Sequence, residues 1–131
     1  LRRRLGGVTL LHDDSVNSHI WIMAKRFLLV IKVNSFKQHI TIQVTVNNFT
    51  FFISIVYAMC DPLEREELWK YLSSFSPGSC AWFIGWDFNT IMQNSNKKGG
   101  WIYSHQAIQD FRDFVANNNL VDMGFTGAKF T

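Results

Sequence analysis

A carboxylate and an amide stand two residues apart after an apolar segment in the second half of the chain. The segment Trp82–Ile84 is followed by Gly85, Trp86, Asp87, Phe88 and Asn89. If this loop is extended, the side chains of residues 87 and 89 point the same way. A carboxylate can take a proton from water or help to hold a metal ion, and an amide can donate a hydrogen bond to a developing oxyanion. Asp and Asn also form turns after strands, and the spacing alone favours that second interpretation.

Tyr57 is a further candidate, thirty residues before Asp87. It closes the apolar segment Phe51–Tyr57, whose pattern is typical of a strand covered on both faces. If this strand and the one before Asp87 are parallel neighbours, Tyr57 and Asp87 lie at the same edge of the sheet. A tyrosine hydroxyl at such an edge can bind a phosphate oxygen. From the spacing alone, a core tyrosine with its hydroxyl at the surface is the favoured interpretation.

The first half of the chain is predicted to form strands. Two glycines lead into a strand over residues 5–11, and residues 19–33 hold two strands or one helix, with β-branched residues favouring a strand over 27–33. Apolar and polar residues alternate over 40–46, which predicts a half-buried strand. Asn47 and Asn48 then predict a turn, so that this strand and the next form a hairpin.

The second half of the chain alternates helix and strand patterns. Its clearest element is a helix that Asp61 can cap, with Pro62 at the first helical position and Glu64 where a capping box requires it. The order of elements predicts a mixed α/β layered domain. The elements expected after residue 60 are a helix over Asp61–Ser74, a short buried strand over Ala81–Gly85, a polar loop over Asp87–Gly100, a helix from Ser104 to about Ala116 that stops at 117–119, and a connection toward another strand over Leu120–Thr131.

Composition bounds the class of protein. A length of 131 residues allows one domain, and 47% apolar with 18% charged residues excludes a disordered chain. The net charge of +3 permits a phosphate-bearing partner, although Arg2–Arg4 read first as a solvated basic terminus. Cys60 and Cys80 are too few for a disulfide framework or a four-ligand zinc site and indicate reduced thiols in a non-secreted, nuclear or cytoplasmic protein. No transmembrane helix is expected, because Lys25-Arg26 and Lys32 break the longest apolar runs.

Three motifs are specific together, although none of them decides alone. They are Val56-Tyr57, the pattern G-x-D-F-N at Gly85–Asn89, and L-x-D-x-G-F-x-G-x-x-F-T at Leu120–Thr131. In this order they resemble the endonuclease/exonuclease/phosphatase superfamily, and more narrowly the endonuclease domain of plant LINE-type (non-LTR) retrotransposons and its degenerate copies. Further matching stretches are Gly6–Leu11, Ser35–Val46, Arg65–Trp69, Lys97–Gly100 and Asp110–Phe114.

The resemblance implies a DNase I-like four-layer α/β/β/α sandwich that cleaves DNA phosphodiesters with Mg²⁺. Residues 1–131 would form one partial domain, about the middle half of the whole and truncated at both ends. Asp87 would activate the attacking water and contribute weakly to the metal site, Asn89 would hydrogen-bond the phosphate, and Tyr57 would support it. Mg²⁺ would offset charge on the leaving oxygen.

The same resemblance implies impaired catalysis. The family's metal-binding Glu lies upstream of the matching segment and its catalytic His downstream of Thr131, while His19, His39 and His105 read as surface or strand-edge residues. Trp86 replaces the second glycine of the family's G-G-D-F-N, where glycine allows backbone angles that tryptophan does not easily match. We therefore expect little or no cleavage.

Two other functions stay open. A non-catalytic nucleic-acid binder would use a basic rim, with Lys97 and Lys98 as weak candidates for phosphate contact, although these two read first as part of a turn. A decayed fragment with no selected function would self-associate through exposed apolar sheet faces and unpaired edges. The superfamily also includes phosphatases of lipids and small molecules, and the retrotransposon-like flanks favour DNA.

Overall fold

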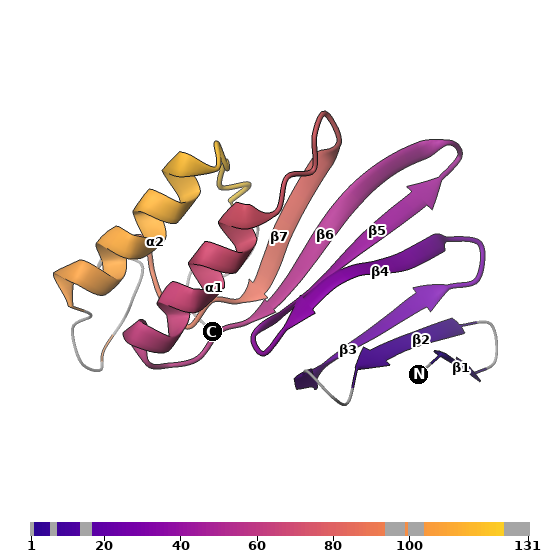
Figure 1. Cartoon of the computed structure of the whole chain (residues 1–131), viewed down its shortest axis with the longest axis horizontal. Coiled ribbons are helices and arrows are strands. Elements are labelled where there is room, and N and C mark those ends of the chain that lie inside the picture. Colours follow the sequence, from indigo (N-terminus) through magenta and orange to yellow (C-terminus); the bar gives the residue numbers. More distant parts are fainter. Residues whose placement is uncertain (1, 6–7, 14–16, 94–98, 100–103, 125–131) are drawn as a thin grey trace. The chain divides into compact units, whose positions relative to one another are not determined.

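The computed structural model describes residues 2–5, 8–13, 17–93, 99 and 104–124, with side chains from His19 onward (Figure 1). Strands and helices both occur, so the fold class is α/β, as predicted. The chain divides into two compact units, each described here by itself. The sheet unit contains Leu1–Met59 and Ser76–Phe88, and the helix unit contains Cys60–Phe75 and Asn89–Thr131.

The sheet unit holds two sheets. One has the order β1-β2-β3 and the other β4-β5-β6-β7. All pairs are antiparallel except β6 and β7, which are parallel. The segment 19–33, predicted as two strands or one helix, belongs to β3 and β4. The strands are β1 (Arg2–Leu5), β2 (Val8–Asp13), β3 (Asn17–Lys25), β4 (Leu29–Phe36), β5 (His39–Val46), β6 (Phe49–Tyr57) and β7 (Ala81–Asp87).

The core of the sheet unit lies between its two sheets. Alternate residues of β3 are buried against aliphatic residues of β4 and β5, and side chains of β6 pack beside them. Burial of each such side chain contributes about 1.5–3 kcal/mol, which makes this layer the main source of stability in the unit. The buried members are Ile20, Ile22, Ala24, Val30, Ile40, Ile42 and Val44.

The turn between β5 and β6 has the predicted position. Val46 pairs with Phe49, so Asn47 and Asn48 form a two-residue loop. Both have positive φ, 48° and 64°. Two-residue hairpin loops of this kind match the twist of the flanking strands, and asparagine tolerates the left-handed region better than most residues. The predicted hairpin is therefore confirmed.

The prediction of a half-buried strand over residues 40–46 is wrong for the first part of β5. Residues 39–42 are buried on both faces: Ile40 and Ile42 pack in the core with residues of β3, and Thr41 contacts Ser54 of β6 on the other face. The buried Thr41 hydroxyl lies 2.7 Å from Ser54 Oγ, and Trp82 Nε1 donates to the same Ser54 Oγ at 2.9 Å. These bonds satisfy polar groups that would otherwise be costly to bury.

The sequence predicts His39 at the surface or at a strand edge, and this prediction is wrong. His39 is buried at the start of β5. Its neighbours in register are Phe36 on β4 and Val56 on β6. Burial disfavours the charged imidazolium and lowers the pKa of His39 to about 4. His19 and His105 are exposed, as expected.

The strand before Asp87 is longer and more exposed than predicted. The buried strand expected over Ala81–Gly85 is β7, which continues to Asp87, and Phe83 and Trp86 are exposed. In the described sheet, β7 is the last strand and has β6 on one side. The further strand that the sequence predicts after Leu120 falls on residues outside the described part of the chain from residue 125 onward.

The helix unit holds α1 (Pro62–Ser74) and α2 (His105–Asn117). Both begin at the predicted caps. The Asp61 carboxylate accepts a hydrogen bond from the Leu63 amide at 2.8 Å, and Ser104 Oγ accepts one from the Ala107 amide at 3.2 Å. After α2, Asn119 has a φ of 52°, which agrees with the predicted stop.

Aromatic side chains join the two helices. The ring of Trp69 in α1 stacks on Phe114 in α2, with 4.9 Å between centroids, and lies 5.2 Å from Phe111. These three side chains are buried, and aromatic contacts of this kind stabilise the fold beyond the effect of their buried area.

Within the described part of the chain, neither helix is long and apolar enough to cross a membrane.

Candidate functional site at the end of β6 and β7

Tyr57 and Asp87 are partners in the register of the parallel strands β6 and β7. Each is the last residue of its strand, so both stand at the carboxyl-terminal edge of the sheet. Neighbouring strands lie about 4.8 Å apart, which brings these two backbones close together. The Ala58 amide donates to the Asp87 carbonyl at 2.9 Å, and this bond holds the edge together just beyond the pair. From the sequence, Tyr57 and Asp87 lie at the same edge of the sheet if their strands are parallel neighbours, and this condition is met. The chemical roles of the two residues remain predictions.

The backbone before Asp87 has the geometry that favours glycine. Trp86 has a φ of 110° and a side chain that is 82% exposed. A residue other than glycine in this region carries strain of about 1–3 kcal/mol. Trp86 is also the residue that stands at the second glycine position in the resemblance expected from the sequence. Its backbone therefore has a conformation typical of glycine although the residue is tryptophan.

Asn89 follows two residues after Asp87 and belongs to the helix unit. The extended conformation considered for residues 87–89 is not formed. β7 ends at Asp87 itself, and Asn89 is half-buried with a φ of 45°. Asparagine tolerates this left-handed conformation because its short polar side chain can hydrogen-bond locally. The simple alternation that would align side chains 87 and 89 therefore does not apply.

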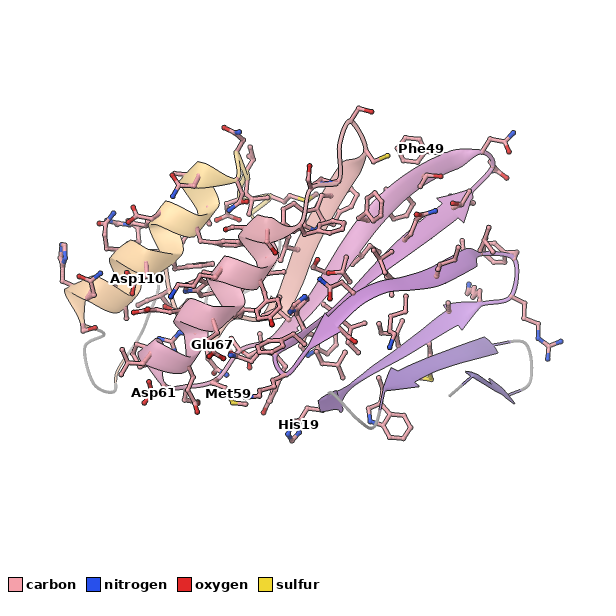
Figure 2. The ribbon with its side chains drawn as sticks, in the orientation of Figure 1. His19, Phe49, Met59, Asp61, Glu67 and Asp110 are labelled. Carbon is pink, nitrogen blue, oxygen red and sulfur yellow. The ribbon has the colours of Figure 1, made fainter. Side chains whose placement is uncertain are left out.

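His19 joins the candidate site from the other sheet. Its ring lies 5.4 Å from the Tyr57 ring, measured between centroids, at an interplanar angle of 32°. Figure 2 shows His19 near the start of β3. The sequence predicted only an ordinary surface or edge histidine at this position. The contact depends on how β3 packs over β6, and no local pattern reports such packing.

Gln38 holds the end of β6 in place. Its backbone carbonyl accepts a hydrogen bond from the Tyr57 amide at 2.8 Å, and its side-chain Oε1 accepts one from the Met59 amide at 2.8 Å. The Gln38 side chain is buried, so these bonds are shielded from competing water. Gln38 was not singled out from the sequence, because glutamine in a turn has no distinctive pattern.

The described residues do not by themselves fit a Mg²⁺ centre. Asp87 is the only carboxylate of the sheet unit whose side chain is described. No group of three His, Cys, Asp or Glu residues that could hold a metal occurs among the described residues. Mg²⁺ requires six oxygen ligands in near-octahedral geometry, which one carboxylate cannot supply without water and substrate phosphates.

The exposed edge residues carry groups of the kinds that form hydrogen bonds to phosphate and to water. A tyrosine hydroxyl can donate to a phosphate oxygen, a carboxylate can accept a proton or a hydrogen bond from water, and an imidazole can do either. Tyr57, Asp87 and His19 supply these groups at one edge of the sheet unit. Lys97 and Lys98, the weaker predicted contacts, lie outside the described residues. Cys60 and Cys80 are both free thiols, as predicted.

No family model, curated protein or solved structure matches this chain.

Proposed function

We propose that the chain derives from a metal-dependent DNA endonuclease of the endonuclease/exonuclease/phosphatase superfamily, of the plant LINE-type retrotransposon kind. The observation that carries the proposal is the pairing of Tyr57 with Asp87 across parallel strands. Both residues belong to motifs of the resemblance, and the positive φ of Trp86 lies at that motif's second glycine position. The pairing and this backbone angle both support the resemblance described from the sequence.

The proposal includes a partial DNase I-like four-layer sandwich. Two stacked sheets with an aliphatic core between them, together with two helices, support it. The assignment of α1 and α2 to an outer layer is part of the proposal.

The expected role of each residue follows from its chemistry. Tyr57 donates a hydrogen bond to a phosphate oxygen, Asp87 accepts a proton from the attacking water, and Asn89 hydrogen-bonds the phosphate. Mg²⁺ is the cofactor that the resemblance implies, but the described residues do not form its site, so no step is assigned to it. Because the described residues do not form a Mg²⁺ site, and because removing part of a concerted site costs orders of magnitude in rate, we expect the 131-residue chain to cleave DNA weakly or not at all.

The experiment is a plasmid-nicking assay with Mg²⁺ and with a chelator. Wild type is compared with Asp87→Ala and with Asp113→Ala, which removes an exposed carboxylate from α2. We expect trace nicking at most, lost in Asp87→Ala and kept in Asp113→Ala. Robust nicking that Asp87→Ala leaves unchanged would contradict the assignment of the site. Robust nicking that Asp87→Ala abolishes would instead contradict the expected impairment.

Nucleic-acid binding without catalysis is the second candidate function. The charge distribution favours it, because the sheet unit has seven basic and three acidic residues, whereas the helix unit has six basic and seven acidic residues. The net charge of +4 on the sheet unit against −1 on the helix unit concentrates attraction for phosphate on the sheets.

A further inference from the structure

The edge formed by Tyr57 and Asp87 combines one hydroxyl donor with one carboxylate. A DNA phosphodiester is an anion, so the Asp87 carboxylate repels it at close range, while the Tyr57 hydroxyl offers a single hydrogen bond against this repulsion. A further N–H donor close to Tyr57 would strengthen the binding of a phosphate here, because hydrogen bonds to a charged oxygen are stronger than those between neutral groups.

His19 brings such a donor from the other sheet. Its ring lies 5.4 Å from the Tyr57 ring, measured between centroids, and the two ring planes differ by 32°. An imidazole ring carries at least one N–H in either protonation state. A donor reaches a phosphate oxygen over about 2.8 Å, so polar groups on two rings this close can bind oxygens of one phosphate.

The backbone on both sides of this ring pair is fixed by the fold. In β3, Ile20 and Ile22 follow His19 closely and are buried in the core between the sheets. In β6, the Tyr57 amide donates to the Gln38 carbonyl at 2.8 Å. Groups that are held in place before a ligand arrives lose less freedom when they bind it.

The ring pair lies at the ends of strands and not on the face of a sheet. Tyr57 is the last residue of β6, and His19 stands near the start of β3 (Figure 2). The outer layers of an α/β/β/α sandwich cover the faces of its sheets. The contact between His19 and Tyr57 therefore does not depend on whether a face of either sheet is covered.

We propose that His19 is a further phosphate contact of the Tyr57–Asp87 edge. Its imidazole N–H and the Tyr57 hydroxyl donate to oxygens of the same DNA phosphate, so that both sheets hold this group. The inference rests on the proposed function, because it requires that the edge binds DNA. It adds to that site a residue from the other sheet.

The test measures the affinity of the whole chain for a fluorescently labelled 12-base-pair duplex by anisotropy, with a chelator present to prevent cleavage. His19→Phe keeps an aromatic ring beside Tyr57 and removes the N–H donor. We expect about tenfold weaker binding, as for loss of a hydrogen bond to a charged group, and a similar effect of Tyr57→Phe. The double variant should differ from the product of the two single effects by about twofold or more, because groups that share one partner are coupled.

Two variants serve as matched controls. His105→Phe makes the same substitution at an exposed position of the helix unit and should leave the affinity within about twofold. Lys25→Gln removes a full positive charge six residues along β3 from His19, about 20 Å away. It should weaken binding less than His19→Phe, because salt screens charges at this distance. The circular dichroism spectrum of each variant checks that it is folded.

The outcomes separate this inference from the proposed function. No binding of wild type at low salt would overturn both. Binding that Tyr57→Phe weakens and His19→Phe leaves unchanged would overturn the role of His19 alone. Equal weakening by His19→Phe and His105→Phe, or independent effects of the His19 and Tyr57 substitutions, would show that the two residues do not share a phosphate and would also overturn it.

Discussion

Tyr57 and Asp87 face each other across two parallel strands although the whole of α1 lies between them in the sequence. A strand, a crossover helix and a second parallel strand bring the carboxyl ends of both strands to one edge. Residues thirty positions apart thereby become neighbours. The two strands, and not a flexible loop, set the separation of this pair.

Replacement of Trp86 by glycine should stabilise the chain by about 1 kcal/mol. The substitution removes the strain of a φ of 110° at a side chain that is 82% exposed, and part of this gain is offset by the greater freedom of glycine in the unfolded state. The free energy of unfolding from urea titration checks it. Trp86→Ala is the control, because alanine loses the ring but keeps the strain. Equal effects of the two variants would show that the ring, and not the backbone, determines the change.

Gln38→Ala should lower the free energy of unfolding by about 1–3 kcal/mol. The variant removes the side-chain acceptor of the partly buried Met59 amide, and loss of such a hydrogen bond is destabilising. Hydrogen exchange offers a sharper readout. Protection should fall at the Met59 amide and persist at the Tyr57 amide, which is bonded to the backbone carbonyl of residue 38. Gln43→Ala, at a half-buried position of β5, should leave both amides protected, and loss of protection at neither amide in Gln38→Ala would rule out this function of Gln38.

His39 should make stability depend on pH between about 6.5 and 4. Its pKa is about 4 in the folded chain and 6.5 when unfolded, so the unfolded state binds more protons in this window. The contribution is complete above pH 6.5 and is lost as the pH falls toward 4, to a total of about 3 kcal/mol.

The measurement for His39 is the free energy of unfolding at several pH values. His39→Leu should flatten the dependence in this window, because leucine fills the site without titrating. His105→Asn, at the exposed start of α2, should keep the wild-type slope. An unchanged slope in His39→Leu would mean that other groups cause the dependence.

Local signals predicted much of the fold. The caps Asp61 and Ser104 and the turn at Asn47-Asn48 each follow from short segments, while the parallel pairing of β6 with β7 entered the sequence analysis only as a condition. Such features depend on backbone preferences and nearby hydrogen bonds, which the sequence displays directly.

Features that depend on strand order or on packing between sheets were predicted wrongly or missed. His39 is buried at the start of β5, between β4 and β6 in the sheet, and β7, the last strand of the described sheet, has exposed residues such as Phe83 and Trp86. The contact of His19 with Tyr57 and the hydrogen bonds of Gln38 join residues distant in the sequence. A single sequence carries no direct record of these partners, so burial and neighbours at such positions could not be deduced from local patterns.

An NMR titration tests most directly whether the Tyr57–Asp87 edge binds a DNA phosphodiester. A 12-base-pair duplex is added to ¹⁵N-labelled chain in wild-type and Tyr57→Phe forms. We expect amide shifts concentrated at residues 57, 58 and 87, none at the Asn47-Asn48 turn, and affinity about tenfold weaker in Tyr57→Phe after loss of a hydrogen bond to charged phosphate. Shifts that avoid residues 57, 58 and 87, or equal affinity of the two forms, would contradict the claim.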